Sequence, residues 1–398
     1  MLQRVKNIFH LLEAVVAALA FGFPSRNLVI IGVTGTDGKT TTTNLIHHIL
    51  TAAGYRTGIL STLSGLHTTT PGRWKVQKFL ATAKNGGCTH IVLEVSSHAI
   101  DQYRVWGINF QVGVLTNIAD HEHLDYHGTF ERYRNTKIKF LKSCRKIIVN
   151  ADDLSSARLL AGLRRDRYLT YGIYQPADIN SQNFPCRSKL IGEFNEYNLL
   201  AAIAAAKILG IEAEVISKAV GTFEPLSGRM EIVNRRPFTV IVDFAHTPQA
   251  FGKVLPEARN LLGKNGRLIH VFGATGDRDK SKRPLMGQIA SQYDDVIMLT
   301  HEDTYAEDPS VIISQIEKGI NGKVFNFGGS FPDEKRKYYL RFAQRKEAIK
   351  QAIELAKPGD VVLLTGVGHQ RSMNIGGKEI PWSEQKIAKD LLGHADHR

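Results

Sequence analysis

The segment IGVTGTDGKTTTTN, residues 31–44, constrains the fold more than any other part of the sequence. The apolar, β-branched run 28–34 predicts a buried parallel strand, and residues 36–54 have the apolar spacing of a helix. A strand, a glycine turn and Lys-Thr at a helix start together wrap backbone N–H groups around phosphates. We therefore predict a nucleotide phosphate site, in which Lys39 reaches the phosphates and the Thr40 hydroxyl ligates Mg²⁺.

One glycine of this phosphate loop is displaced. The usual spacing G-x-x-x-x-G-K-[ST] places a glycine at position 33, where this chain has Val33 between Gly32 and Gly35. A strand–helix turn with incidental glycines is the alternative interpretation. The Gly-Lys-Thr sequence argues against it, because it follows a predicted strand and opens a predicted helix.

Apolar runs that predict strands alternate with helix-sized segments along the chain. The clearest runs are 89–97, 111–119, 146–153, 238–248, 267–276, 295–300 and 360–368. This alternation predicts an α/β fold with mostly parallel sheets, whose functional residues follow the carboxyl ends of strands. A domain boundary is expected near 221–236, where Gly, Pro and charged residues interrupt the pattern.

Composition limits the classes of partner. The 398 residues are 43% hydrophobic and 22% charged, as in an ordinary globular protein. Three widely spaced cysteines form neither a metal pattern nor a disulfide framework, which favours a cytoplasmic location. The net charge of +13 suits anionic substrates, but the aromatic-basic motif of RNA-binding proteins is missing, so no nucleic-acid partner is predicted. The dense basic run at 333–350 is interpreted as a solvated helix face.

Residues 7–23 are apolar and follow Arg4 and Lys6. The segment is shorter than a membrane span and contains a histidine and a glutamate. A signal peptide also fits the pattern, since Ala18-Leu19-Ala20 has the A-x-A form of a cleavage site, but we expect the segment to remain part of the folded chain. Two interpretations remain: a helix packed on the first domain, and an interfacial helix that makes a weak membrane contact.

Candidate metal ligands follow two of the predicted strands. Glu94 ends a buried strand, where a carboxylate is costly unless it meets a cation, so with Thr40 it could hold Mg²⁺ on a nucleotide. The segment 116–128 is rich in His and carboxylates but lacks H-E-x-x-H and nearby cysteines. A hard-cation site completed by one imidazole is more consistent with a neighbouring phosphate loop, although any single histidine here could equally be structural.

The chain resembles the Mur ligase family over roughly residues 22–393, and most closely its UDP-N-acetylmuramoyl-tripeptide synthetase branch. Nine motifs occur in the family order. They are TGTDGKTTT (34–42), LEVSSHAIDQYRV (93–105), TNIADHEHLDYHGT (116–129), VNADD (149–153), GEFNEYN (192–198), SGRME (227–231), VDFAHTP (242–248), FGATGDRDKSKRP (272–284) and GVGHQ (366–370). These ligases use the displaced phosphate loop, whereas their folate-polyglutamating relatives usually have Gly-Lys-Gly.

The resemblance implies an organisation and a reaction. It implies an N-terminal helix at 1–26, a P-loop-type central ATPase domain at 27–226 and a C-terminal Rossmann-like domain at 227–398. A carboxylate of a cell-wall precursor, expected to be a muramoyl peptide, would attack ATP to give an acyl phosphate. An amino acid would then displace phosphate and form an amide, with cations neutralising the anionic reactants. The alternatives are a Mur-like ligase acting on a non-UDP acceptor and a non-catalytic nucleotide-binding scaffold.

The resemblance also implies the residues that contact ATP. Asn195 and Asn198 would hold the base and ribose, unless they merely cap a helix, and Arg229 would reach phosphate. The full set of ATP contacts comprises Gly35, Thr36, Asp37, Gly38, Lys39, Thr40, Thr41, Asn195, Asn198, Arg229, Asp243 and His246.

Two Mg²⁺ sites follow from the same resemblance. Thr40 and Glu94 would serve the first ion, and His123 and Lys137 the second. Lys137 matches a family Tyr-x-x-x-Lys pattern and would act as a carbamate, because an unmodified ammonium repels Mg²⁺. A surface helix lysine is the alternative interpretation. With Lys39, these residues make the expected catalytic set Lys39, Glu94, His123 and Lys137.

Further positions match contacts of the family with its substrates. They are Thr69, Thr70, Ser96, Gln102 and Arg104 for the muramoyl peptide, and Arg278, Gly366 and Gln370 near the incoming amino acid. Residues 302–305, Glu-Asp-Thr-Tyr, stand where diaminopimelate-adding members carry Asp-Asn-Pro-Arg, and Gln370 replaces a glutamate. Both changes remove groups used on diaminopimelate, so lysine or another amino acid without a second carboxylate is expected. Because only 26 residues precede the first domain, we expect little recognition of uridine.

Overall fold

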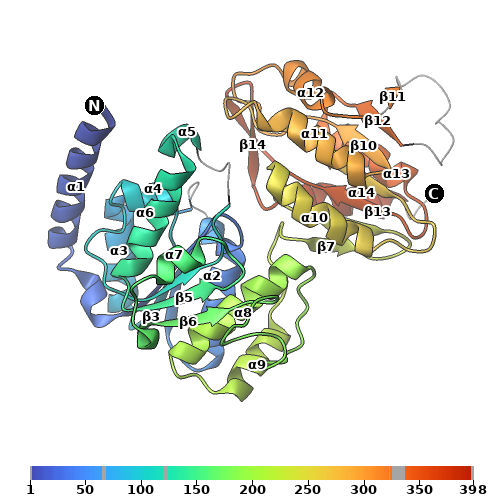
Figure 1. Cartoon of the computed structure of the whole chain (residues 1–398). Coiled ribbons are helices and arrows are strands. Elements are labelled where there is room, and N and C mark those ends of the chain that lie inside the picture. Colours follow the sequence, from blue (N-terminus) through green and yellow to red (C-terminus); the bar gives the residue numbers. More distant parts are fainter. Residues whose placement is uncertain (1, 65–68, 120–123, 322, 325–336, 396–398) are drawn as a thin grey trace. The chain divides into compact units, whose positions relative to one another are not determined.

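The computed structural model describes residues 2–64, 69–119, 124–321, 323–324 and 337–395. The chain divides into two compact units, Met1–Glu224 and Pro225–Arg398, and the division falls inside the predicted interruption at 221–236. Each unit has a sheet of mostly parallel strands covered by helices (Figure 1). The predicted α/β fold class is therefore confirmed.

The sheet of unit 1 is entirely parallel, with strand order β2-β3-β1-β4-β5-β6. The apolar run that precedes the phosphate loop forms the inner strand β1 of this sheet. A strand that is buried on both faces needs such a continuous apolar sequence. The strands are β1 (Val29–Thr34), β2 (Thr57–Leu60), β3 (His90–Glu94), β4 (Phe110–Leu115), β5 (Lys146–Asn150) and β6 (Tyr168–Tyr171).

Helices cover both faces of this sheet. The apolar side chains of β1 point alternately to the two faces, so both faces must be buried. Ile30 joins a core with residues of α3 and α6, whereas α2 packs on α8 and α9. The helices are α1 (Leu2–Ala20), α2 (Lys39–Ala52), α3 (Arg73–Asn85), α4 (Ser97–Asp101), α5 (Leu124–His127), α6 (Phe130–Ser143), α7 (Ser156–Leu160), α8 (Glu193–Ile208) and α9 (Ala213–Thr222), with short 3₁₀ turns at Pro24–Asn27, Thr62–Ser64 and Arg165–Arg167.

Unit 2 has a seven-stranded sheet in the order β11-β12-β10-β9-β13-β8-β7, in which only β7 runs antiparallel to its neighbour. The strands are β7 (Glu231–Asn234), β8 (Thr239–Val242), β9 (Leu268–Phe272), β10 (Val296–Leu299), β11 (Lys323–Val324), β12 (Tyr338–Arg341) and β13 (Val361–Leu364), and a hairpin follows at β14 (Ser372–Ile375) and β15 (Lys378–Pro381). The helices are α10 (Pro248–Asn260), α11 (Lys282–Tyr293), α12 (Pro309–Glu317), α13 (Arg345–Leu355) and α14 (Glu384–Ala395).

The observed strands end earlier than the sequence runs that predicted them. The run 238–248 leaves the sheet after Val242, and the run 360–368 leaves it after Leu364. Their polar ends are therefore loops at the carboxyl edge of the sheet, where sites lie in α/β folds.

Helix α1 packs on α3 and buries Ala14, Ala17 and Ala18, in agreement with the packed-helix interpretation of residues 7–23. None of the helices within the described ranges has the length and apolar character needed to cross a bilayer.

The interpretation of residues 333–350 as a solvated helix face is wrong for its described part. Residues 338–341 form strand β12, and Arg345 at the start of α13 has a fully buried side chain. Its Nε donates to Glu384 at 3.0 Å, and its other nitrogens donate to the carbonyl oxygens of Thr365, at 2.6 Å, and His301, at 3.4 Å. The guanidinium therefore joins the ends of β10 and β13 to the start of α14.

Removing the charge of Glu384 tests this buried pair. Glu384→Gln should lower the free energy of unfolding by about 3 kcal/mol, because an uncompensated buried guanidinium remains. The matched control is Glu131→Gln, which breaks the exposed pair with Arg158 and should cost less than about 1 kcal/mol. Urea unfolding measures both, and equal midpoints for the two variants would contradict the central role of Arg345.

Candidate functional site

The phosphate loop of residues 35–38 connects β1 to α2 in a conformation that requires glycine at two positions. Gly38 has φ +77°, and a Cβ there would lie 2.1 Å from Oδ1 of Asn198. A Cβ at Gly35 would lie 1.8 Å from Oγ1 of Thr116. The two glycines let the loop pack closely on its neighbours and place the N-terminus of α2 at the sheet edge.

Groups that follow β4 hold this loop in place. The Thr116 hydroxyl donates to the Asp37 carbonyl at 2.6 Å, and the Asp37 N–H donates to Oδ1 of Asn117 at 3.0 Å. The Thr36 hydroxyl lies 2.8 Å from the Tyr133 hydroxyl of α6. Thr36 and Asp37 were predicted as ATP contacts, and these neighbours fix their conformation.

Two lysine side chains converge on one carbonyl oxygen of the loop. Nζ of Lys39 donates to Gly35 at 3.0 Å and to Thr36 at 2.6 Å, and Nζ of Lys137 donates to the same Gly35 oxygen at 2.7 Å. Lys137 is 1% exposed, so the alternative of a surface lysine is wrong. Burial, together with the charge of Lys39, lowers the pKa of Lys137 well below its ordinary value.

Thr40 and Glu94 lie together beside the loop, as predicted. The Thr40 hydroxyl donates to both carboxylate oxygens of Glu94, at 3.0 and 3.2 Å. The N–H and hydroxyl of Thr62 also donate to Glu94, at 2.9 and 3.0 Å. Glu94 is only 2% exposed, so neutral donors surround a buried carboxylate next to a phosphate-type loop. Such a group is costly without a cation.

This donor set fits Mg²⁺, which prefers oxygen ligands and is usually held by one or two carboxylates together with substrate phosphates. Within the described ranges no three His, Cys, Asp or Glu side chains cluster as a metal site, so phosphate oxygens would have to complete the coordination. His123, predicted for the second ion, lies outside the described residues.

The residues predicted to hold a muramoyl peptide gather after the end of β3. The Thr70 hydroxyl donates to the carbonyl of Glu94 at 2.8 Å and accepts from the N–H of Ser96 at 3.0 Å. Arg104 donates to the Thr70 carbonyl at 2.6 Å and to the Gln102 side chain at 2.7 and 3.1 Å. Thr69 joins them through a 3.3 Å contact between its hydroxyl and that of Thr62.

Asn195 and Asn198 lie on α8, both buried, and face the start of α2. Nδ2 of Asn198 donates to Asn195 at 3.0 Å, and the Thr42 hydroxyl donates to Oδ1 of Asn198 at 3.3 Å. Asn195 also donates to the Ile191 carbonyl at 2.7 Å. The N-cap residue of α8 is Gly192, with no side-chain cap hydrogen bond, so the helix-cap interpretation of the two asparagines is wrong. Thr41 is buried one residue before Thr42.

Three predicted ATP contacts belong to unit 2. Asp243 follows β8 and accepts the N–H groups of Met230 and Ala245, both at 2.7 Å, so it orders the turn that carries Arg229. The Arg229 guanidinium lies 4.9 Å from the centre of the Phe244 ring. Nδ1 of His246 lies 2.8 Å from the Phe244 carbonyl. Their contact with ATP stays a prediction.

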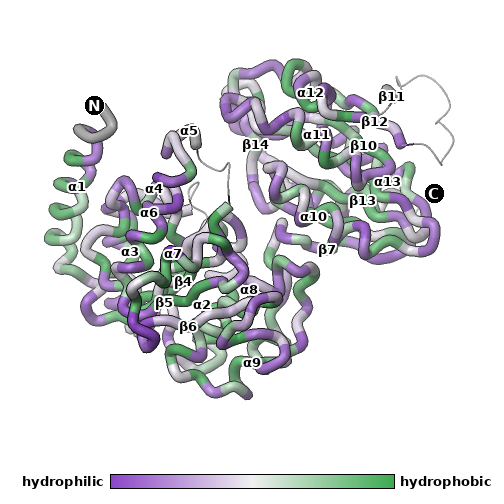
Figure 2. The backbone as a smooth tube through the Cα atoms, viewed as in Figure 1, coloured by the Kyte–Doolittle hydropathy of each residue, from purple (hydrophilic) through white to green (hydrophobic). Residues whose placement is uncertain are grey.

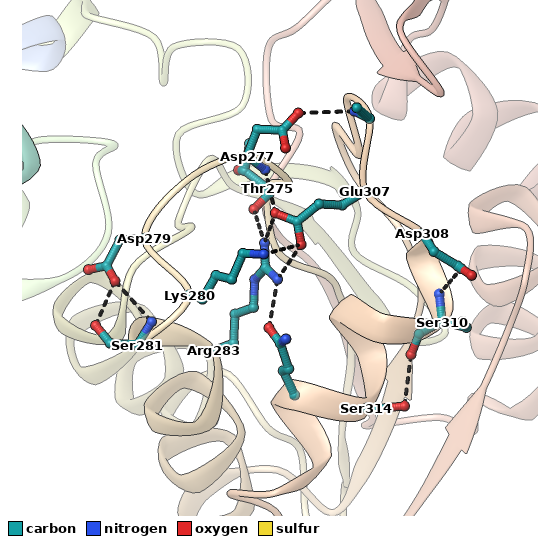
Figure 3. Close-up of polar contacts among 12 residues, drawn as sticks. Thr275, Asp277, Asp279, Lys280, Ser281, Arg283, Glu307, Asp308, Ser310 and Ser314 are labelled. Atoms are coloured by element: carbon teal, nitrogen blue, oxygen red, sulfur yellow. Dashed lines mark hydrogen bonds and ion pairs between the residues drawn. The ribbon is translucent and has the colours of Figure 1, made fainter.

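Arg278 is exposed on the loop between β9 and α11. The loop around it is fixed by Glu307, which accepts from the buried Arg283 at 2.8 and 3.2 Å and from the Asp277 N–H at 2.7 Å (Figure 3). These donors lower the pKa of Glu307 to about 2, with the hydrogen bond from Arg283 as the largest cause. The carboxylate therefore remains charged, and the loop remains anchored, at any pH near neutrality.

Gly366 and Gln370, the other predicted amino-acid contacts, meet the 302–305 segment within unit 2. Nε2 of Gln370 donates to Oδ2 of Asp303 at 3.0 Å, and the Asn374 N–H donates to the other oxygen at 2.7 Å. Gly366 has φ +101°, and a Cβ there would lie 2.0 Å from Oε2 of Glu302. Burial raises the pKa of Glu302.

Sequence reasoning missed the residues that support these groups. Thr62 contributes two donors to Glu94, and Asn117 and Tyr133 lock the phosphate loop, yet none was predicted as a site residue. A usable signal existed for Asn117, because it lies near the carboxyl end of the predicted strand run 111–119. Thr62 lies in a short turn after a strand that the periodicity did not predict, so only the fold reveals it.

Comparison with known proteins identifies relatives of both units. Residues 33–206 match the Mur ligase middle domain, and residues 228–368 match the Mur ligase, glutamate ligase domain. The UDP-N-acetylmuramoyl-L-alanyl-D-glutamate–2,6-diaminopimelate ligase of Aquifex aeolicus is 40% identical over 94% of this chain and 79% of its own length. The enzyme of the same name, numbered 1, from Clostridium acetobutylicum is 34% identical over 95% of this chain and 81% of its own length.

Solved structures agree with these matches. A structure of a UDP-N-acetylmuramoyl-L-alanyl-D-glutamate–2,6-diaminopimelate ligase has a TM-score of 0.64 at 30% identity and covers 94% of this chain and 80% of that one. Escherichia coli FolC in complex with ADP has a TM-score of 0.68 at 20% identity, over 97% of this chain and 94% of that one. The second likeness is one of fold alone.

Proposed function

The chain belongs to the Mur ligase family, and from that premise we propose that it adds an amino acid to the peptide carboxylate of a muramoyl peptide in cell-wall synthesis. It is an acid–amino-acid ligase, an enzyme that joins a carboxylic acid to an amino group. ATP as the energy source, Mg²⁺ as the metal and the cytoplasm as the location are parts of the proposal. The partners are small molecules, with an additional weak membrane contact through residues 7–23.

One observation carries the proposal: Lys39 and Lys137 both donate to the Gly35 oxygen, in the loop that leads to the Thr40–Glu94 pair. Two lysine side chains beside a helix N-terminus form a site that an anion would stabilise. A triphosphate supplies that anion, and the loop geometry fits phosphate oxygens. A loop that merely connected β1 to α2 would need neither lysine.

The chemistry then runs in two steps. A substrate carboxylate oxygen attacks the γ-phosphorus, the bond to the β-phosphate oxygen breaks, and ADP leaves with that electron pair. The amino nitrogen next attacks the acyl carbon of the acyl phosphate, phosphate leaves, and the nitrogen loses a proton to give the amide. Lys39 and the N-terminus of α2 would stabilise charge on the transferred phosphoryl group in both steps.

Mg²⁺ would neutralise phosphate charge and orient the phosphoryl group. Thr40 and Glu94 would hold the first ion, supported by the buried Glu94 carboxylate with its neutral donors. Lys137, as a carbamate, and His123 would hold the second. The support for Lys137 is its buried position at the loop and its matching Tyr133, whose hydroxyl lies against Thr36.

The acceptor end of the site would use the residues after β3. Thr70, Ser96 and Arg104 are already linked to one another and to the backbone of Glu94, so substrate contacts made there would be transmitted directly to the proposed metal ligand. Thr69 and Gln102 complete the set that we propose for the sugar-peptide part.

For the amino acid, we infer lysine or another residue without a second carboxylate. The support is in unit 2, where Gln370 holds the Asp303 carboxylate and the neutral Tyr305 stands where the family pattern has an arginine. A distal carboxylate would meet the Asp303 charge without a guanidinium fork, whereas an ammonium would be attracted. The relatives described above carry diaminopimelate in their names. The residue at position 305 therefore tests whether this chain uses lysine or diaminopimelate. Arg278 and Gly366 are the further contacts proposed for this substrate.

The phosphate site is tested by Lys39→Ala and Glu94→Gln. Each should lower kcat for amide formation by about 10²–10³, because one preorganised charge-stabilising group is lost. The assay mixes ATP, Mg²⁺, UDP-muramoyl dipeptide and lysine, and follows both phosphate release and the mass of the product. Lys84→Ala, at an exposed lysine of α3, is the control with unchanged kcat.

Near-normal turnover of either variant at saturating ATP would overturn the placement of the triphosphate. If the unaltered protein releases no phosphate with any acceptor and amino acid, the nucleotide-binding scaffold replaces the proposed ligase.

The carbamate is tested by Lys137→Ala. The variant should be inactive and partly rescued by acetate or formate, whose carboxylate oxygens can replace those of the carbamate. Lys139→Ala is the matched control, because Lys139 lies on the same helix with an exposed side chain. Full activity of Lys137→Ala without any added acid would refute the carbamate.

The choice of amino acid is tested by competition between lysine and diaminopimelate. We expect kcat/KM for lysine to exceed that for diaminopimelate by about tenfold or more, since one charge-assisted pair contributes about 1.5–3 kcal/mol. Tyr305→Arg should shift the ratio toward diaminopimelate by about tenfold, and Tyr305→Phe should leave it unchanged. Both substitutions keep the positive φ of this residue, so backbone strain is matched. A preference of the unaltered enzyme for diaminopimelate would contradict the inference.

A further inference from the structure

Helix α1 has an exposed apolar face. Its members are Ile8, Phe9, Leu12, Val16 and Leu19, whose exposed fractions lie between 53% and 71%. At 100° per residue, these five side chains fall on an arc of about 100°, and the buried Ala14, Ala17 and Ala18 lie on the opposite side. Green segments recur along α1 in the hydropathy colouring (Figure 2). We call these five residues the α1 stripe.

The α1 stripe is unusual for this chain. Among the described residues, twelve large hydrophobic side chains are exposed, and five of them belong to the stripe. The others occur singly or as isolated positions, such as Leu154, Tyr174 and Leu285, which is normal for a protein surface. A contiguous exposed apolar face instead marks an interaction surface.

The surroundings of the stripe are cationic and aromatic. Lys6 is exposed on α1, and Lys75 and Lys78 are exposed on α3, the helix that packs against α1. Arg26 is exposed just after α1, with its guanidinium 4.5 Å from the centre of the Phe23 ring. Trp74, partly exposed, makes an edge contact with Phe21.

The one carboxylate of α1 is already neutralised. Glu13 lies 2.8 Å from the guanidinium of Arg73. The helix therefore combines an exposed apolar face with an exposed lysine, a paired acid and exposed cations on the neighbouring α3, which is the pattern of a helix that lies in a membrane interface. Such a helix places its apolar face at the acyl boundary, Trp at the headgroup level and Lys or Arg beside lipid phosphates.

Resting on the membrane contact included in the proposed function for residues 7–23, we propose that the α1 stripe binds an anionic phospholipid surface, with α1 lying in the plane of the interface. Charge complementarity favours this occupant over a second copy of the chain. The protein carries a net charge of +13, so two copies repel each other as they approach. An anionic membrane instead attracts the protein, at about 1 kcal/mol for each Lys or Arg near its surface.

Vesicle co-sedimentation of the full chain tests the proposal without any substrate, so its outcome is independent of the ligase activity. The full chain should bind vesicles of phosphatidylcholine mixed with phosphatidylglycerol, and bind pure phosphatidylcholine vesicles more weakly. Leu12→Ser and Val16→Ser should each weaken binding to the anionic vesicles by about tenfold, because each removes one large apolar contact. The matched control is Leu154→Ser at a side chain that is 99% exposed elsewhere in unit 1, and it should have no effect.

The charge contribution has its own variants. Lys75→Ala and Lys78→Ala should each weaken binding to anionic vesicles by about fivefold, leave binding to pure phosphatidylcholine unchanged, and lose their effect at high salt. Failure of the full chain to bind either kind of vesicle would overturn the proposal. So would equal effects of Leu154→Ser and Leu12→Ser. A concentration-dependent dimer in sedimentation that Leu12→Ser abolishes, with no vesicle binding, would assign the stripe to self-association instead.

Discussion

The carbonyl oxygen of Gly35 accepts hydrogen bonds from the ammonium groups of both Lys39 and Lys137. Two cationic groups this close repel each other unless an anion lies between them or one of them loses its charge. Burial already lowers the pKa of Lys137, and a carbamate would reverse its sign altogether. A nucleotide phosphate would be attracted to these two lysines, of which Lys137 also interacts with the carboxylates of Asp37 and Asp153. The conformation of the phosphate loop in turn depends on two glycines that admit no side chain.

The ends of the neighbouring strands hold the phosphate loop and its surroundings in place. The end of β4 provides Thr116 and Asn117, which bind the backbone of Asp37 on either side of the loop. The end of β3 provides Glu94, and the chain just beyond it provides Ser96, which is joined through Thr70 to the proposed acceptor contacts. Because β3, β1 and β4 are adjacent in a parallel sheet, their carboxyl ends bring the proposed metal, phosphate and acceptor groups to one edge.

In unit 2 as well, the loops at the carboxyl ends of the strands carry the proposed site residues, here those for the amino acid. Two Arg–Glu ion pairs, Arg283 with Glu307 and Arg345 with Glu384, connect its loops after β9, β10 and β13. Buried pairs contribute little net stability but are costly to break, so they favour one arrangement of the loops over others. That arrangement presents Asp303, held by Gln370, in the segment where the family pattern has its diaminopimelate contacts. The specificity proposed for the amino acid would thus rest on a carboxylate whose orientation is set by hydrogen bonds.

Local chemistry made much of this protein readable from its sequence. A strand, a glycine turn and Lys39-Thr40 at a helix start can form only a small number of structures, and the predicted α/β fold is confirmed. The ordered motifs also singled out Glu94, Lys137 and Asn198 as site residues, and all three lie beside the phosphate loop or the start of α2. Burial decided the rest, because it depends on contacts between residues far apart in the chain. Arg345 looked like a solvated cation and is enclosed by elements from three other parts of unit 2. Thr62 had no motif and became a Glu94 donor only through the pairing of β2 with β3. Residues 7–23 were apolar in sequence, but only the packing of α1 on α3 determined which side chains are buried and which remain exposed to meet a partner.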